Sequence, residues 1–500
     1  MLPHFLLPRL PSSLYTFLDV QENNVPPTPV INESLSYYLN DIKHQINLYE
    51  QLWETFKRFT NPYEYIHTTV PFKKYCISRY HPLSRSFFKM IELIHFFDLG
   101  MDTTQPIRSF HLAEGPGGFI EALVKYRNRS DDMYVGMTLQ DQHHHNHNIP
   151  GWKKSHHFLQ EHGDVVQLEH GSDGTGNILS LNNFVHIHET YGSTMDLVTA
   201  DGGFDFSSDF DHQEINMTQL LYGQIVYALC LQKTGGCFVL KVFDIFMQHT
   251  VDIIALLSSM YEKVYITKPN TSRSANSEKY IVCKGFLPTS SYKFYPYLLQ
   301  SFRTMLAIPL EEDDVSLHKN AYIERIFRTD VPIHHYFVNR IEECNIVLGQ
   351  SQIENIYVTL SFIVGECMPH CRVSSTTLFD GGGSKKTRRT APRPPKREGG
   401  GTQGQFVSSK DDVEGGSLPS LAVPNDLVSN SEKNEEVVAL LNWPDMKGIE
   451  TIDFPASGRG RVSDTPNQRN YYRSKIQNLI KSNIHKCVQW CIQHNLQYNY

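Results

Sequence analysis

Apolar side chains recur at helical spacing in the first part of the chain. Residues 1–30 hold six prolines and predict an irregular arm. From Glu33 to Phe56 the repeat predicts one long amphipathic helix that packs on a core. A second helix is predicted from Ser84 to Leu99, because a proline and then a serine precede its apolar repeat. The apolar positions of the first repeat are Leu35, Leu39, Ile42, Ile46, Tyr49, Leu52 and Phe56.

Farther along the chain, short apolar runs typical of buried strands alternate with helical patterns. This alternation predicts an α/β fold with a mostly parallel sheet flanked by helices. In such sheets, ligands bind beyond the carboxyl ends of the strands. Residues 290–365 are helical and aromatic-rich in pattern, which predicts a helical extension covering the core. The strand-like runs are Ser109–Ala113, Met133–Thr138, Met195–Ala200, Cys237–Phe243, Lys263–Thr267 and Tyr280–Cys283, and the clearest helical patterns between them are Phe119–Tyr126 and Thr218–Gln232.

One predicted strand carries a lysine inside its apolar run. Lys241 lies at the centre of Phe238–Phe243, a run typical of a strand buried on both faces. A buried ammonium needs a partner, because removing its water is costly. Lys89, Asp201 and Glu278 lie in segments that could converge on it. Such a cluster is what abstraction of a proton from a poor nucleophile requires, so we expect an enzyme.

The charge, the cysteines and the length of the apolar runs limit the partners and the compartment that we expect for this chain. The 500 residues include 46 basic and 53 acidic side chains, for a net charge of −7, so any contact with nucleic acid must come from a local patch. The nine scattered cysteines and the lack of a signal peptide favour a reducing compartment. No apolar run is long enough to span a bilayer, so we expect a soluble intracellular protein without membrane contact.

The composition changes at Asp380. Glycines, prolines and the basic group Lys385–Arg389 predict a disordered linker up to about residue 435, and a plain linker is favoured over an RNA-contacting or localisation segment. A helical period from Tyr471 to Cys491 follows, in a tail that either docks on the core or folds alone.

A glycine-rich segment follows the first of the central strands. It runs from Glu114 to Phe119, at the predicted start of a helix, where glycines and free backbone N–H groups allow a ligand to approach closely. The third glycine of a dinucleotide fingerprint is missing, and no Gly-Lys-Ser/Thr follows as in a P-loop.

This segment resembles motif I of the FtsJ-type S-adenosylmethionine-dependent RNA ribose 2′-O-methyltransferases. Four further segments match motifs of the family in order, so that all four positions of its Lys-Asp-Lys-Glu tetrad are present. The resemblance covers roughly residues 60–290. The matching segments are Glu114–Phe119, Ser84–Lys89, Asp201–Phe204, Gly235–Lys241 and Lys268–Tyr280.

The resemblance implies a Rossmann-like methyltransferase that uses S-adenosylmethionine and acts on RNA. It implies that Lys241 is the base for the ribose 2′-hydroxyl, that Lys89 positions the hydroxyl, and that Asp201 and Glu278 orient the two amines. A base beside the hydroxyl is needed because the hydroxyl is a weak acid. Holding methyl and oxygen in line would supply much of the rate.

The long N-terminal arm and the Asn61–Glu64 segment look more like the mRNA cap enzymes than the compact ribosomal-RNA enzymes. We therefore expect 5′-capped mRNA as the substrate, methylated at its first transcribed nucleotide, with other capping or transcription proteins as candidate partners. The combination also resembles proteins of large cytoplasmic DNA viruses. A cytoplasmic location, including a viral factory or virion, is expected, with the nucleus as the alternative. For the 7-methylguanine, the Tyr292–Tyr297 stretch is a candidate aromatic region.

The resemblance also assigns contacts with the cofactor. Asn177 occupies the position where the family often has an aspartate for the adenine amino group, with Asp173 as the alternative. Asp141 is a candidate for the cofactor ribose. The expected cofactor-binding residues are Glu114, Gly115, Pro116, Gly117, Gly118, Phe119, Asp173, Asn177 and Asp201.

No metal is expected in the reaction. The histidines at 143–147 and the group Cys367, His370 and Cys371 have a metal-like spacing, which Cys487–His494 could complete, but free side chains are favoured for both groups. The alternatives to a cap enzyme are a ribosomal-RNA 2′-O-methyltransferase, an inactive methyltransferase-like RNA-binding subunit and, least favoured, a nicotinamide oxidoreductase. The predicted divisions are an N-terminal arm and helix (1–80), a methyltransferase core (81–290), a helical extension (291–379), the linker (380–435) and a partly helical tail (436–500).

Overall fold

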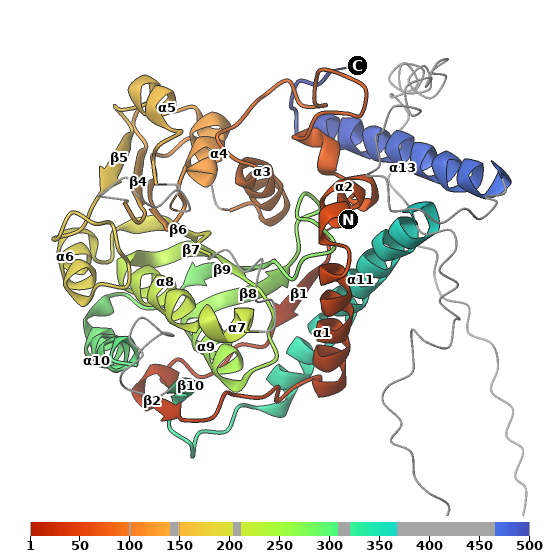
Figure 1. Cartoon of the computed structure of the whole chain (residues 1–500). Helices are drawn as coiled ribbons and strands as arrows, with labels where there is room; N and C mark the ends of the chain where they lie inside the picture. The colour runs from red at the N-terminus through yellow and green to blue at the C-terminus, as the bar shows by residue number, and fades with distance from the viewer. Residues whose placement is uncertain are drawn as a thin grey trace, which may run out of the picture. The chain divides into compact units, whose positions relative to one another are not determined.

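The computed structural model describes residues 2–99, 102–140, 149, 151–203, 212–308, 321–367 and 466–499. All of these residues belong to one compact unit (Figure 1). The predicted linker at 380–435, Asp141, the histidines at 143–147, and His370 and Cys371 lie outside the described residues.

The unit is built on an eight-stranded sheet in the order β1-β8-β9-β7-β6-β3-β4-β5. The neighbours from β7 through β5 are parallel, whereas β9 is antiparallel to both β7 and β8, and β1 is antiparallel to β8. The predicted mostly parallel α/β fold is therefore confirmed. The strands are β1 (His4–Leu7), β3 (Arg108–Leu112), β4 (Met133–Met137), β5 (Val166–Glu169), β6 (Met195–Ala200), β7 (Gln232–Val242), β8 (Tyr261–Thr267) and β9 (Lys279–Phe286).

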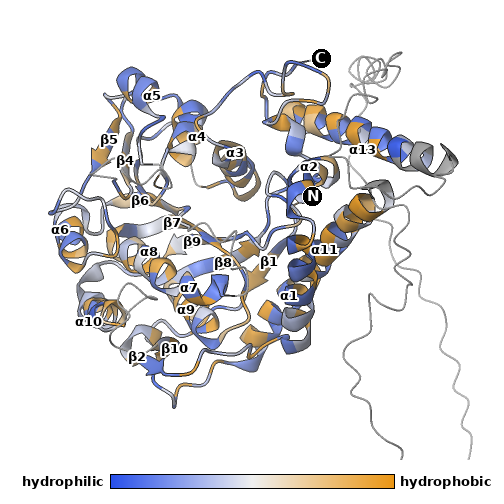
Figure 2. Ribbon diagram, viewed as in Figure 1, coloured by the Kyte–Doolittle hydropathy of each residue, from blue (hydrophilic) through white to orange (hydrophobic). Residues whose placement is uncertain are grey.

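Helices cover both faces of the sheet, which explains why its central strands are apolar on both sides. In Figure 1, α8 (Thr218–Leu231) and α9 (Gln248–Met260) lie on one face, and α3 (Ser86–Phe97) and α4 (Gly118–Arg127) on the other. Every residue of α8 is buried, because α6 and α10 pack on its outer side. Figure 2 colours many residues of this helix as hydrophobic. The remaining helical elements are η1 (Leu14–Phe17), α1 (Glu33–Asn47), α2 (Glu50–Thr60), η2 (Glu64–Ile66), α5 (His156–Glu161), α6 (Leu181–Tyr191), α7 (Gln213–Asn216), η3 (Ser291–Lys293), α10 (Tyr295–Leu306), α11 (His335–Cys367) and α13 (Pro466–Gln493).

Two predictions for the N-terminal region are wrong. Residues 1–30 are not wholly irregular, since they contain β1 and also β2 (Leu18–Asn23), which pairs with β10 (Tyr322–Phe327) in a separate two-stranded sheet. The partners lie hundreds of residues away, so local sequence carries little sign of this pairing. The single long helix is in fact α1 and α2, interrupted near Tyr49, because each helix packs on its own stretch of α11.

The helical pattern from Tyr471 to Cys491 is confirmed as α13. This helix docks on the core, where it contacts η2, α2 and α11. Beyond it, Tyr498 forms a β-bridge with Ser78. Among the described helices, none is both long enough and apolar enough to cross a membrane.

The strand order creates a switch point between β3 and β6. The chain continues from β3 to β4 and β5 on one side, and to β6 and β7 on the other. The loops after β3 and β6 therefore meet at the carboxyl edge of the sheet, the usual location of ligands in such folds.

Candidate active site

Lys89 and Glu278 form an ion pair at the carboxyl edge. Lys89 lies in the first turn of α3, and Glu278 immediately precedes β9. The Lys89 Nζ atom donates to Glu278 Oε2 at 2.8 Å, and the two side chains are only 11% and 9% exposed. Ser272 donates to the other oxygen, Oε1, at 2.7 Å. The carboxylate is therefore fixed from both sides.

Lys241 and Asp201 form the second pair. Lys241, near the end of β7, donates to the Asp201 backbone carbonyl at 2.7 Å and lies 3.4 Å from Asp201 Oδ1. Gly203 makes this approach feasible, since a Cβ atom there would lie 3.1 Å from Lys241 Nζ. The turn after β6 thus supplies both the carboxylate and the space beside the lysine.

Tyr280 lies between the two pairs. It is opposite Lys241 in the β7–β9 register, and its phenol donates to Asp201 Oδ1 at 2.9 Å. Lys89 Nζ lies 5.8 Å from the centre of its ring. All four residues of the predicted tetrad are therefore brought together around one buried tyrosine.

Burial and the charges in this cluster shift the pKa values of two side chains, Glu278 and Tyr280. Burial favours the neutral form of Glu278, but the ammonium charges of Lys89 and Lys241 outweigh burial and lower the pKa of Glu278 below its usual range. Burial, followed by the charges of Asp201 and Glu278, raises the pKa of Tyr280 well above its ordinary value. Glu278 is thus held as a carboxylate and Tyr280 as a phenol that donates.

The glycine-rich segment lies at the end of β3, as predicted. Gly117 has a left-handed φ of 101°, and α4 begins at the next residue, Gly118. A Cβ at Gly118 would come within 2.2 Å of Ser86 Oγ, so this glycine allows α4 to pack against the start of α3. Gly115 is equally tight against the backbone of Gly151. Pro116 lies between these glycines, and Phe119 is fully buried in the first turn of α4.

Glu114 is a buried carboxyl at this loop. Thr199 donates to its Oε1 atom, whereas Oε2 lies 3.5 Å from His111 Nδ1 and has no hydrogen-bond partner in the described part of the chain. Burial raises the pKa of Glu114. A buried oxygen without a partner needs an explanation, and a bound ligand would supply one.

The loop after β5 carries Asp173 and Asn177. Both side chains accept hydrogen bonds from residues of the same loop. Asp173 Oδ1 accepts from the backbone and hydroxyl of Thr175 and from Asn183, which lowers the pKa of Asp173 to about 2. Asn177 Oδ1 accepts from the backbone of Leu179 at 2.9 Å. The loop lies against the chain after β4, since Gln140 donates its backbone N–H to Thr175. The adenine contact assigned to Asp173 or Asn177 stays a prediction.

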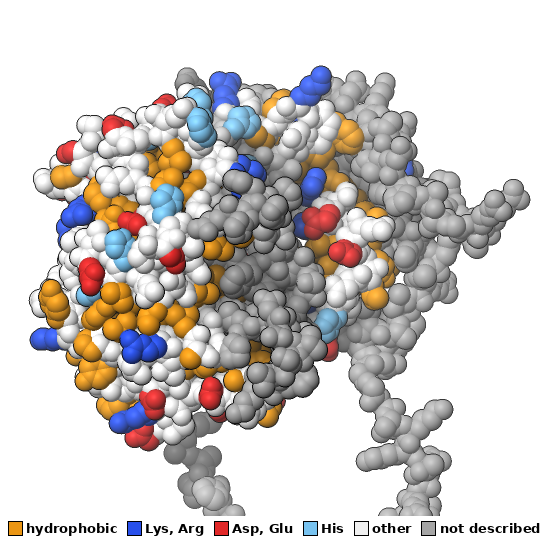
Figure 3. Space-filling model, turned by 60° about the vertical axis from the view of Figure 1, so that its left-hand side comes forward, with side chains coloured by type: hydrophobic (Ala, Val, Ile, Leu, Met, Phe, Trp, Pro, Cys, Tyr) orange, Lys and Arg blue, Asp and Glu red, His pale blue; other side chains and the backbone are white. Residues whose placement is uncertain are grey.

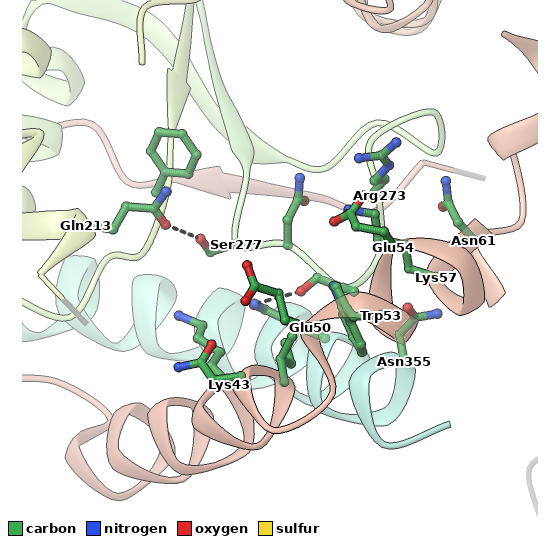
Figure 4. A pocket seen from close by; sticks show the side chains of 16 residues that line it. Lys43, Glu50, Trp53, Glu54, Lys57, Asn61, Gln213, Arg273, Ser277 and Asn355 are labelled. Carbon is green, nitrogen blue, oxygen red and sulfur yellow. Dashed lines mark hydrogen bonds and ion pairs between the residues drawn. The ribbon is translucent and has the colours of Figure 1, made fainter. Parts of the chain in front are cut away.

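A cavity of about 470 Å³ opens next to the tetrad loop. Figure 4 shows Glu50, Trp53 and Lys57 of α2 on one side of it, and Gln213 and Ser277 on the other. Ser277 directly precedes Glu278 in the chain. The Ser277 hydroxyl donates a hydrogen bond to Gln213 at 2.9 Å. The cavity therefore combines an aromatic ring, carboxylates and cations within reach of the candidate catalytic residues. The complete lining consists of Lys43, Ile46, Asn47, Glu50, Trp53, Glu54, Lys57, Asn61, Gln213, Phe243, Arg273, Ala275, Asn276, Ser277, Gln352 and Asn355.

The candidate aromatic region Tyr292–Tyr297 does not line this cavity and belongs instead to η3 and α10. Within the described ranges, no three His, Cys, Asp or Glu side chains are grouped to hold a metal ion. Cys487 and Cys491 are buried free thiols on α13.

Residues 82–286 match the family model described as FtsJ-like methyltransferase. This part of the chain is an FtsJ-like methyltransferase domain. It contains all four tetrad residues and the glycine-rich segment, whereas Glu64, α1, α2, α11 and α13 lie outside it.

The FtsJ-like domain also resembles curated proteins. A cap-specific mRNA (nucleoside-2′-O-)-methyltransferase 2 of Danio rerio is 30% identical over 277 residues, which cover 51% of this chain and 35% of that protein. A cap-specific mRNA (nucleoside-2′-O-)-methyltransferase 1 of Mus musculus is 40% identical over 180 residues, or 34% of this chain and 20% of that protein. The chain thus spans about a third or less of these relatives, which give no support to the resemblance to viral proteins.

Among solved structures, a ribosomal RNA methyltransferase from Plasmodium falciparum aligns with a TM-score of 0.29 and 20% identity, covering 41% of this chain and 98% of that chain.

Sequence reasoning gave Tyr280 no role in the FtsJ-like site, although it lies in a matching segment. Tyr280 was visible as the last residue of its motif, two positions after Glu278 and hence on the same side of an extended chain. The cavity could not be predicted from the sequence, because its lining comes from α1, α2 and α11, which meet only in the folded structure.

Proposed function

We propose that this chain transfers the methyl group of S-adenosylmethionine to the ribose 2′-hydroxyl of the first transcribed nucleotide of capped mRNA. The observation that carries this proposal is the pairing of Lys89 with Glu278 and of Lys241 with Asp201, beside a cavity, in an FtsJ-like domain. The names of the relatives support the choice of capped mRNA.

The residues at the carboxyl edge fit the cofactor. Glu114 offers a buried oxygen without a partner among the described residues, Gly117 adopts a left-handed backbone conformation at the turn, and α4 presents its N-terminus. Asp173 and Asn177 would face the adenine, while Asp201 would lie next to the methionine part. When bound, S-adenosylmethionine supplies an electrophilic methyl group on a sulfonium.

The side chains of the tetrad would handle the hydroxyl. Lys241, in its neutral form, would accept the proton of the 2′-hydroxyl as the oxygen attacks, and its Nζ is already oriented by the Asp201 carbonyl. Lys89, fixed by Glu278, would donate to the same oxygen and hold it in line with the methyl group. Tyr280 keeps the Asp201 carboxylate in place.

The cavity is the proposed location of the 5′ cap. A 7-methylguanine carries a positive charge and a flat ring, which suit Trp53 and the carboxylate of Glu50. The cations of the cavity already have partners, since Lys57 pairs with Glu54 and Arg273 with Glu64. On the face shown in Figure 3, the described Lys and Arg side chains are scattered among acidic ones. Local recognition in a cavity, in place of a broad basic surface, is consistent with the net charge of −7.

The test is transfer of labelled methyl from S-adenosylmethionine to matched capped and uncapped RNAs by the wild-type chain and Lys241→Ala. We expect label on the capped RNA alone, located at the 2′-oxygen of the first nucleotide, and its loss in the variant. Equal labelling of uncapped RNA would instead favour a ribosomal or general RNA methyltransferase. Binding of the cofactor without transfer to any RNA would indicate an inactive RNA-binding subunit.

A further inference from the structure

Glu64 lies outside the FtsJ-like domain, in η2, yet it is bonded to two of the domain's motif segments. We propose that Glu64 is a positioning residue that sets the geometry of the Lys89–Glu278 pair, and thereby of the proposed methyl transfer. This inference rests on the proposed function.

The Glu64 carboxylate is buried and accepts hydrogen bonds from several segments of the chain. Its side chain is 1% exposed, and the described residues donate five hydrogen bonds to it. Arg85 Nη1 donates to Oε2 at 2.7 Å, and Arg273 donates through Nε to Oε2 at 3.2 Å and through Nη2 to Oε1 at 3.0 Å. Asn61 and Thr68 supply the other two hydrogen bonds.

The two arginines belong to the segments that carry the tetrad pair. Arg85 caps α3, one turn before Lys89, and Arg273 lies in the loop that ends at Glu278. Arg85 also donates to the carbonyl of Thr271 at 2.9 Å, which ties the start of α3 directly to that loop. The Glu64 carboxylate is therefore bonded to both segments and adds to the direct bond between them.

Glu92, farther along α3, holds the same loop through the backbone N–H groups of Asn270 and Thr271. Glu92 secures the near end of the loop, whereas Glu64 binds the arginine closer to Glu278. Without the Glu64 charge, the two guanidinium groups, which are 19% and 38% exposed, would face each other without the carboxylate that bridges them, so we expect the segments to move apart. A displacement of about 1 Å at a catalytic group can reduce a rate by roughly 100-fold.

The principal test compares Glu64→Gln with Asp132→Asn. Asp132 is a matched control, because it too is a buried carboxylate bonded to an arginine, Arg127, at 2.6 Å, but it adjoins the amino ends of β3 and β4. For each purified variant, kcat and KM for capped RNA are measured per folded molecule, together with the dissociation constant of S-adenosylmethionine. Glu64→Asp, which keeps the charge, is the second variant if Glu64→Gln does not fold.

We expect Glu64→Gln to lower kcat by about 10- to 100-fold, with cofactor affinity within twofold of wild type, and Asp132→Asn to retain kcat. A kcat within twofold of wild type in Glu64→Gln would overturn the inference. A separate readout is the rate at which acetic anhydride acylates Lys89, expected to rise several-fold in Glu64→Gln. If the wild-type chain methylates no RNA, the proposed function fails, and the acylation rate alone decides whether Glu64 positions the pair.

Discussion

The phenol of Tyr280 reaches from β9 past β7 to the carboxylate of Asp201, which follows β6, and donates to Oδ1 at 2.9 Å. The hydrogen bond thus passes the strand that carries Lys241 and joins the two halves of the tetrad. The Asp201 carboxylate is oriented by a group that has no acid–base role in the proposed chemistry.

Tyr280→Phe should therefore lower kcat about tenfold while leaving KM for RNA unchanged, because a hydrogen bond to a charged group contributes about 1.5–3 kcal/mol. The measurement is steady-state methyl transfer. Tyr134→Phe is the control, since Tyr134 also donates to a buried carboxylate, Asp132, at 2.7 Å, but away from the tetrad. Equal losses in the two variants would show that the effect is one of stability alone.

Gly203→Ala should reduce kcat about tenfold with little change in melting temperature. The new methyl group would lie 3.1 Å from Lys241 Nζ and displace the ammonium from the Asp201 carbonyl. Gly349→Ala, on α11, brings a methyl group equally close, at 3.1 Å, to Leu35 Cδ2 and should keep full activity. An active Gly203→Ala variant would mean that Lys241 tolerates the shift.

Glu50→Gln should raise KM for capped RNA about tenfold and leave kcat at saturation unchanged. The cavity would lose a carboxylate that faces the positively charged 7-methylguanine. Kinetics with capped and uncapped RNAs provide the check, with Glu343→Gln on α11, outside the cavity lining, as the control. An unchanged KM would place the cap elsewhere.

Glu214 is a buried carboxyl on α7. Its titration should lower the free energy of unfolding as the pH rises. Burial raises the pKa of Glu214 to about 7 in the folded chain, against about 4.3 for a free glutamate. The folded state therefore binds this proton more tightly, so the stabilisation is complete below about pH 4.3 and is lost as the pH rises through 7. The loss is on the order of 4 kcal/mol. Denaturant unfolding from pH 5 to 8 should show this slope in the wild type and a flatter one in Glu214→Gln, and equal slopes would contradict the assignment.

Much of the central sheet and of the tetrad could be predicted from the sequence. The predicted strand Met195–Ala200 coincides with β6. It could be predicted because a strand buried on both faces is a nearly continuous run of apolar residues. Lys241 was conspicuous for the same reason, since an ammonium stands out in such a run.

The elements around the sheet could not be predicted in the same way. The arrangement that breaks the first helix near Tyr49 depends on α11, almost three hundred residues later. The role of Glu64 depends on arginines from two distant segments, and the sequence around Glu64 shows no sign of them. Long-range contacts of this kind leave no local periodicity.

The docking of α13 has a consequence for biosynthesis. Asn483 donates to the carbonyls of Phe59 and Asn61, so a helix near the end of the described chain braces the segment that leads into Glu64. At ordinary rates of translation, α13 emerges roughly 10 to 40 s after the FtsJ-like domain has been synthesised. During that interval the nascent chain holds all four tetrad residues but lacks the brace for Glu64. The site therefore gains this support only after the FtsJ-like domain itself has been synthesised.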